Sequence, residues 1–178
     1  MWRRSRLPVP VHPGLRPTPD RVRETLYNWL GQDLTGWRVL DAYAGSGALG
    51  FEAGSRGAAE VTLIERDAQL VRSLIATRQR LKADSLQIES ADALAWMRRA
   101  ATDRAGLWDL VLLDPPFDAG LFETSLQAAM PLLRPGGCLY LEAPAQWQAE
   151  VAGATLHRHL QAGAVHAHLW IKSGAPAS

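Results

Sequence analysis

Cysteine is almost absent from this sequence of 178 residues, since Cys138 stands alone and excludes an internal disulfide. Lone cysteines are typical of reducing compartments, so we expect a cytoplasmic location. Long hydrophobic runs are also missing. The longest apolar run in the central part, residues 110–113, is far shorter than the roughly 20 residues that a membrane helix needs. Prolines at positions 8, 10 and 13 interrupt the N-terminus where a secretion signal would be apolar.

Lysine is scarce as well, because all but two of the 19 basic residues are arginine. The first 23 residues hold six arginines and one acid, whereas the whole chain has a net charge of only +1. Five prolines in the same stretch indicate an extended arm over residues 1–19, followed by a single domain over residues 20–178. A basic arm suits a polyanion such as RNA, although a solvated tail explains the charge equally well.

From residue 37 onward, short apolar segments alternate with amphipathic ones, which is typical of an α/β fold. A first helix over 20–30, capped by Asp20 or Thr18, precedes them. The expected strands span 38–43, 60–65, 86–92, 108–114, 138–142, 155–160 and 165–172, and the later helices 48–56, 68–82, 93–101 and 121–133. Only Ala162-Gly163 joins the last two strands, so they form a hairpin. We therefore expect a mostly parallel sheet with one antiparallel strand and helices on both faces.

A glycine-rich loop follows the first expected strand. It runs from Asp41 to Gly50 and contains Gly45-Ser46-Gly47, so that residues 45–50 fit the pattern G-x-G-x-x-G. In a dinucleotide site such glycines follow the strand directly, and the next helix holds a pyrophosphate. Here Asp41 ends the strand and would repel a phosphate. The loop suits S-adenosylmethionine (SAM) better than NAD, because SAM carries an ammonium and a sulfonium but no phosphate.

Two further acids end the next two strands. Glu65 follows Gly45 by 20 residues, where a carboxylate can accept hydrogen bonds from ribose hydroxyls. Asp92 can accept a hydrogen bond from an adenine amino group. Because ligands of open α/β sheets bind at the carboxyl ends of the strands, we expect Asp41, Glu65 and Asp92 to surround one nucleoside. The alternative is that each acid caps the helix that follows it.

The fourth strand ends in Asp114-Pro115-Pro116-Phe117. Prolines have no N–H group and fix the backbone angle φ, so carbonyls at this turn can point into the crevice as acceptors. Acceptors on both hydrogens of a planar amine would localise its lone pair, and the Phe117 ring could stack on a base. The motif therefore favours methyl transfer to an exocyclic nitrogen, although a proline-rich turn after a core strand is the plainer interpretation.

With both motifs the chain resembles the class I, Rossmann-like SAM-dependent methyltransferases of the N-methylating D/N-P-P-F/Y group. It is most similar to the bacterial 16S ribosomal RNA guanine-N2 methyltransferase family, and the similarity continues through residues 15–30 and 135–142. The resemblance implies a seven-stranded sheet and a guanine amine held at Asp114–Phe117. It also implies small-subunit rRNA in an assembled or assembling subunit as substrate. We expect a monomer without membrane contact.

The resemblance also assigns individual residues. The cofactor contacts it implies are Asp41, Tyr43, Gly45, Ser46, Gly47, Glu65, Arg66, Asp92, Ala93 and Asp114. The expected RNA contacts, from the resemblance and the charge of the arm, are Arg3, Arg4, Arg6, Arg16, Thr18 and Arg21. In the family the arm corresponds to an N-terminal hairpin, of which this sequence is expected to hold only a part.

Three other interpretations remain. The chain could methylate another amine, in DNA adenine or protein glutamine, or be a non-catalytic RNA-binding module; an NAD enzyme is disfavoured by Asp41. The chain has no space for the large target-recognition domain of restriction-type DNA enzymes.

Histidines 157, 159, 166 and 168 form two H-x-H pairs on the expected hairpin. A metal site there is conceivable, but a solvated or RNA-facing sheet edge is more ordinary, so no metal is expected.

Overall fold

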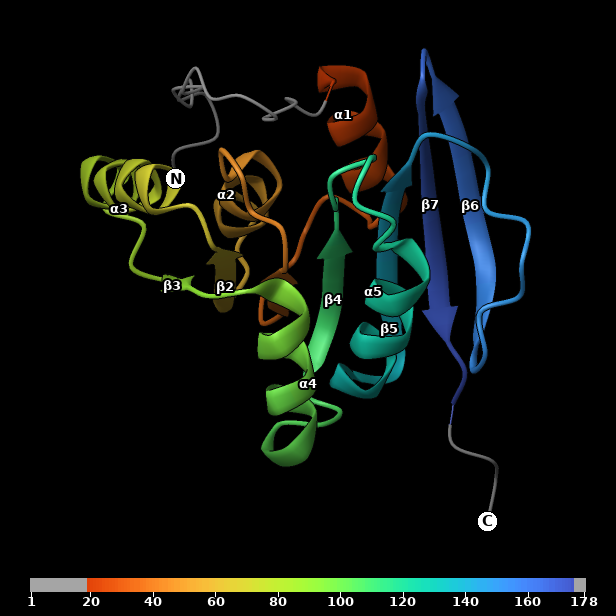
Figure 1. Ribbon diagram of the computed structural model, residues 1–178. Helices are drawn as coiled ribbons and strands as arrows, with labels where there is room; N and C mark the ends of the chain where they lie inside the picture. Colours follow the sequence, from red (N-terminus) through yellow and green to blue (C-terminus); the bar gives the residue numbers. More distant parts are fainter. Residues whose placement is uncertain (1–18, 175–178) are drawn as a thin grey trace.

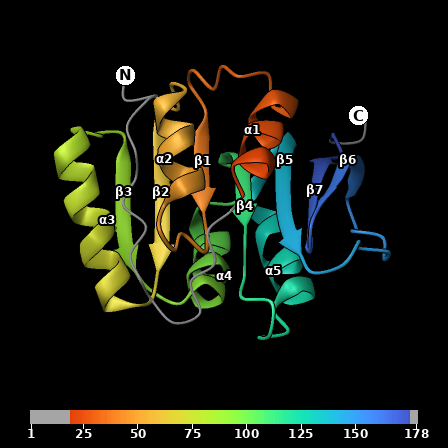
Figure 2. The same cartoon turned by 90° about the horizontal axis from the view of Figure 1, so that it is seen from above.

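The computed structural model describes residues 19–174 (Figure 1). Seven strands form one sheet in the order β3-β2-β1-β4-β5-β7-β6, which Figure 2 shows across the molecule. β7 runs antiparallel to β5 and β6, and the other strands share one direction. The strands are β1 Arg38–Asp41, β2 Glu60–Glu65, β3 Leu86–Ser90, β4 Trp108–Leu113, β5 Leu133–Ala143, β6 Ala154–Ala162 and β7 Val165–Lys172. The predicted Rossmann-like sheet with a C-terminal hairpin is confirmed.

Helices cover both faces of the sheet. On one face lie α1 (Asp20–Trp29), α2 (Ala48–Ser55) and α3 (Ala68–Leu81), and on the other lie α4 (Ala93–Asp103) and α5 (Phe122–Ala129). The central strand β4 is apolar from Leu110 to Leu113 because this part of it serves both layers. Leu110 and Leu112 pack in the first core, while Val111 and Leu113 pack in the second.

The start of α1 differs from expectation. The residue before the helix is Pro19, which makes no side-chain cap, and Thr18 lies outside the described residues. Asp20 is instead the first helical residue and pairs with Arg23 at 2.9 Å. Asp20 also places a negative charge in the first turn, where it complements the helix dipole.

The segment after α5 is the largest correction. The helix expected to run to residue 133 ends at Ala129, and a 3₁₀ turn over Met130–Leu132 leads directly into β5. The Pro135-Gly136-Gly137 sequence does not end a helix but lies inside β5. Leu133 pairs with Trp108 and Cys138 with Leu110, so the residues between them form a bulge, which accommodates a proline without breaking the sheet.

Two other features need little revision. The hairpin turn is Gly163-Ala164 and not Ala162-Gly163, because Ala162 already pairs with Val165. Gly163 has a φ of 59°, which such a two-residue turn requires. No helix within residues 19–174 is long and apolar enough to cross a membrane.

Candidate active site

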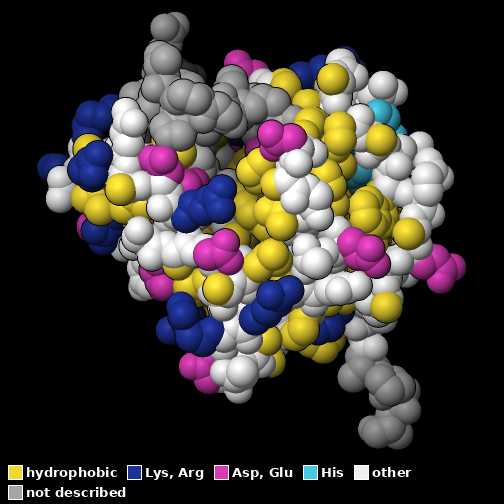
Figure 3. All heavy atoms as spheres, in the orientation of Figure 1, with side chains coloured by type: hydrophobic (Ala, Val, Ile, Leu, Met, Phe, Trp, Pro, Cys, Tyr) yellow, Lys and Arg dark blue, Asp and Glu magenta, His cyan; other side chains and the backbone are white. Residues whose placement is uncertain are grey.

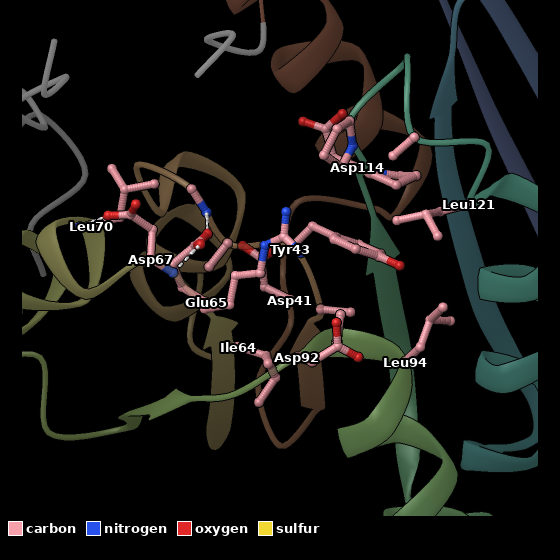
Figure 4. Close-up of a pocket in the computed structure, with 18 of the residues that line it drawn as sticks. Asp41, Tyr43, Ile64, Glu65, Asp67, Leu70, Asp92, Leu94, Asp114 and Leu121 are labelled. Atoms are coloured by element: carbon pink, nitrogen blue, oxygen red, sulfur yellow. Dashed lines mark hydrogen bonds between the residues drawn. The ribbon is translucent and has the colours of Figure 1, made fainter. Parts of the chain in front are cut away.

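A cavity of about 730 Å³ opens at the carboxyl ends of β1, β2, β3 and β4. Figure 4 shows four acids, Asp41, Glu65, Asp92 and Asp114, reaching it from four different segments. The structure therefore brings together the two motifs that lie more than 60 residues apart in the sequence. Of the expected site residues, those that line this cavity are Asp41, Tyr43, Gly45, Ser46, Glu65, Arg66, Asp92, Ala93, Asp114, Pro115, Pro116 and Phe117.

Asp41 is the most buried acid of the site, with 1% of its surface exposed. One carboxylate oxygen accepts the backbone N–H of Gly50 at 3.0 Å. The pKa of Asp41 is raised to about 7, first by burial and then by the charges of Asp114 and Glu65, while the Gly50 N–H partly opposes the shift. A cation entering the cavity would relieve both the burial and the repulsion, so the site favours a positively charged ligand.

Glu65 braces the glycine loop. Its Oε2 accepts the N–H of Gly45 at 2.9 Å, and its Oε1 accepts the N–H of Asp67 at 3.0 Å. A carboxylate oxygen can accept two hydrogen bonds, so each oxygen keeps a lone pair for a ligand hydroxyl. Glu65 can thus shape the loop and bind a ligand with the same two atoms.

Asp92 partly fulfils the alternative role of a helix cap. Its Oδ1 accepts the N–H of Ala95 at 2.9 Å at the start of α4, and this cap leaves Oδ2 for a ligand. Asp67 caps α3 in the same way, accepting from Gln69 at 2.9 Å and Leu70 at 3.0 Å. The cap fixes where the Asp92 carboxylate lies at the rim of the cavity.

Gly47, which the resemblance gives as a cofactor contact, is not among the residues that line the cavity. It has a φ of 85°, and a Cβ built on it would lie 2.6 Å from Leu74 and 2.7 Å from Phe51. Gly47 therefore lets the loop pack closely on α2 and α3, as the spacing of a nucleotide-binding loop also requires. This close packing holds the backbone of the glycine loop in place beside the cavity.

The Asp114–Phe117 turn forms the far wall of the cavity. Asp114 directly follows β4, Pro115 is buried, Pro116 is exposed, and Phe117 is half-buried. The Phe117 ring packs on Phe122 at the start of α5, with ring centroids 6.1 Å apart and planes tilted by 57°. This contact fixes one edge of the aromatic ring and leaves the turn facing the cavity.

Sequence reasoning missed several neighbours of the site. Tyr43 and the buried Ser125 of α5 share a hydrogen bond of 2.6 Å, which ties the glycine loop to the opposite helix layer. Burial raises the pKa of Tyr43, and the Ser125 bond opposes this shift. No local pattern signals a contact across 82 positions. Leu70, Leu94 and Leu121 add apolar wall to the cavity.

The remaining expected residues divide into two groups. Arg3, Arg4, Arg6, Arg16 and Thr18 lie outside the described residues, whereas Arg21 is exposed on α1. No cluster of three or more potential ligands among residues 19–174 could hold a metal ion, the C-terminal histidines included.

The residues that line the cavity fit SAM. Six acids line it, Asp67 and Asp118 besides the four above, against the single cation Arg66. Such an excess of negative charge opposes the phosphates of NAD and attracts a sulfonium or ammonium. The apolar side chains of Ile64 and Leu94 in the wall next to Asp92 suit the face of an adenine.

Known proteins are similar to this chain in sequence and in fold. The family model described as Conserved hypothetical protein 95 matches residues 1–171. Ribosomal RNA small subunit methyltransferase D of Escherichia coli is 41% identical over 177 residues, covering 95% of this chain and 85% of the relative. The relative of the same name from Haemophilus influenzae is 41% identical over 146 residues, covering 80% of this chain and 75% of that protein.

A solved structure agrees with these relatives. A putative methyltransferase from Escherichia coli superimposes with a TM-score of 0.81 at 37% identity, covering 95% of this chain and 92% of its own. The resemblance inferred from the two motifs is confirmed. The chain belongs to the Conserved hypothetical protein 95 family, which is the family of the ribosomal RNA small subunit methyltransferase D proteins.

Proposed function

We propose that this protein transfers a methyl group from SAM to the exocyclic N2 amine of a guanine in small-subunit rRNA. The observation that carries the proposal is one cavity in which an excess of acids meets the Asp114–Phe117 turn. The relatives named for small-subunit rRNA supply the substrate class. The choice of guanine N2 rests on the resemblance of the motifs and of the whole chain to that family.

Three acids would hold the cofactor. Asp41 would face its positive charge, Glu65 its ribose hydroxyls and Asp92 its adenine amino group. When bound, SAM supplies an electrophilic methyl group on a sulfonium. The glycine loop is already held by Glu65, and the Tyr43–Ser125 bond fixes the opposite wall, so the protein presents a formed site to the ligand.

The Asp114–Phe117 turn would handle the amine. The lone pair of an exocyclic guanine nitrogen is delocalised into the ring, so the amine is a poor nucleophile. Acceptors at the Asp114 side chain and the Pro115 carbonyl would bind its two hydrogens and localise that pair. Phe117 would stack on the base and keep water from one face of it.

Positioning supplies most of the acceleration in this mechanism. Well-oriented reacting groups can lower a barrier by about 7–11 kcal/mol. No strong base is needed, because the alkylated nitrogen is acidic and releases its proton to Asp114 or to water. The base must also leave its stack to reach the cavity, so the target guanine lies in unpaired or opened RNA.

We further propose that the basic arm over residues 1–19 and Arg21 contact the RNA backbone, as the charge of the N-terminus suggests. The substrate is the assembled or assembling small subunit, and the protein acts there as a cytoplasmic monomer. The arm would contribute salt-dependent affinity, and the cavity the choice of base.

Transfer of tritium from labelled SAM tests the proposal. We expect label in small-subunit rRNA from cells that lack this protein and no label in DNA or protein. Sequencing would then find one guanine modified only when the protein is present. Label in DNA or in a protein glutamine would contradict the rRNA substrate while retaining the methyl donor.

A further inference from the structure

A second hollow, of about 340 Å³, lies beside the active-site cavity. Its walls are Phe122, the first residue of α5, and residues 143–149, which comprise the end of β5 and the loop after it. β4 and β5 are parallel, so the hollow and the Asp114–Phe117 turn occupy the same edge of the sheet. We call it the flanking hollow.

Aromatic side chains connect the two cavities. Phe117 lines the active-site cavity and packs on Phe122, which lines the flanking hollow. The preceding residue Leu121 lines the active-site cavity. Hydrophobic side chains extend across this face of the molecule in Figure 3, from the central hollow toward the strands of the C-terminal hairpin. The wall of the flanking hollow thus adjoins the wall of the proposed substrate site.

The loop that forms one wall of the flanking hollow is anchored to β7 through His168. The backbone N–H of Trp147 donates to Nε2 of the buried His168 at 2.9 Å, and Nδ1 of His168 lies 3.2 Å from the carbonyl oxygen of Leu141. Burial lowers the pKa of His168 to about 4, with His159 and His166 adding to the effect and the Leu141 carbonyl opposing it. A neutral His168 can donate from Nδ1 and accept at Nε2, so Trp147 is anchored at neutral pH.

The chemistry of the flanking hollow selects a flat, uncharged ligand. None of its lining residues is ionisable, and Gln146 and Gln148 add exposed amide groups. The Nε1–H of the half-buried Trp147 is shielded from solvent and has no acceptor among the described residues. Aromatic walls with amides beside them suit a nucleobase, which stacks by its face and forms hydrogen bonds along its edge.

We propose that the flanking hollow binds an unpaired nucleobase next to the target guanine in the RNA. The inference rests on the proposed function. Removing a guanine from its stack leaves the adjacent base without a stacking partner, and Trp147 and Phe122 would replace that partner. The hollow would thereby hold the RNA strand open while the guanine occupies the active-site cavity.

Two variants test this assignment on small subunits and 16S rRNA from cells that lack the protein. Trp147→Ala removes the indole, and Ala145→Glu places a charge at an exposed wall position without removing any core packing. We expect each to raise the KM for RNA by about 5- to 150-fold while kcat and SAM affinity are kept. Ala59→Glu, at an exposed position before β2, is the matched control and should leave KM unchanged.

Ultraviolet cross-linking gives a readout besides turnover. We expect a peptide containing Phe122 or Trp147 to carry a nucleotide close in sequence to the methylated guanine. Unchanged KM in both variants, or no nucleotide on either peptide, overturns the inference even when the wild type methylates RNA normally. A cross-link of these peptides to a ribosomal protein, or a dimer that covers Trp147, assigns another occupant and also overturns it. No methylation by the wild type refutes the proposed function, and this inference with it.

Discussion

Asp41, at the end of β1, and Gly50, in α2, lie in close contact that only a glycine at position 50 allows. The Asp41 carboxylate accepts the Gly50 N–H at 3.0 Å, and a Cβ on Gly50 would lie 3.0 Å from the same oxygen. The absence of a side chain at position 50 therefore lets a buried carboxylate sit against the helix. The Gly50 N–H is one partner of a charge that is otherwise desolvated and repelled by Asp114 and Glu65.

Replacing Asp41 with asparagine should stabilise the protein and weaken SAM binding. The folded pKa of about 7 lies above the ordinary value of 3.8, so the folded state loses stability as pH rises from about 4 to 7. This loss amounts to about 4 kcal/mol above pH 7, at about 1.36 kcal/mol for each pH unit. The amide of the Asp41→Asn variant does not ionise and keeps an oxygen for the Gly50 N–H. Urea unfolding at pH 5 and pH 8 should show a larger gain at pH 8, and an equal gain at both pH values would contradict the assignment.

SAM affinity should increase with pH. Asp41 is protonated in part of the free molecules near pH 7, and a cationic ligand favours its ionised form. Below pH 7, affinity should fall by up to about tenfold for each pH unit, and it should level off above pH 8. Calorimetry in buffers of different ionisation heat would reveal the proton released on binding. The Asp41→Asn variant should lack this pH dependence, which serves as the control.

Asp114 variants separate hydrogen-bond acceptance from charge. Asp114→Ala should abolish methyl transfer and leave SAM binding largely intact, because the amine loses an acceptor while the three cofactor acids remain. Asp114→Asn keeps a carbonyl oxygen and should retain more activity than the alanine variant. Asp103→Ala, at an exposed position ending α4, is the matched control. Retained turnover in Asp114→Ala would count against the mechanism.

Gly47→Ala should destabilise the fold by about 2 kcal/mol or more, because it combines a left-handed backbone with contacts of 2.6 and 2.7 Å to Leu74 and Phe51. Gly106→Ala provides the comparison. Its φ of 71° is similar, but no atom lies within 4 Å of its Cβ position, so it should cost only about 1 kcal/mol. Thermal unfolding measures both, and equal losses would mean that packing around Gly47 is not tight.

Sequence patterns predicted the layer structure and the place of the site well. The boundaries of β2 and β7 are as expected, because uninterrupted strand patterns end there at clear breaks. The acids at the strand ends converge because parallel strands place their carboxyl ends together. The glycine spacing identified the loop but not which of its glycines lines the cavity.

The errors arose where distant contacts override local rules. Pro135 and its glycines usually end a helix, yet the pairing of β5 with β4 on both sides of them absorbs them as a bulge. Within α1, Trp29 is only half-buried, while Tyr27 is fully buried. The Tyr27 hydroxyl donates to the Leu49 carbonyl at 2.5 Å, a partner that the α1 sequence could not indicate.

The twofold attachment of Glu65 has a consequence for turnover. The two oxygens of Glu65 accept backbone N–H groups of the glycine loop and of the residue before α3. The loop therefore keeps its shape without a ligand. The demethylated cofactor can then leave and a new SAM can bind without local unfolding of the chain. Hydrogen exchange at Gly45 and Asp67 should therefore stay slow both with and without the cofactor.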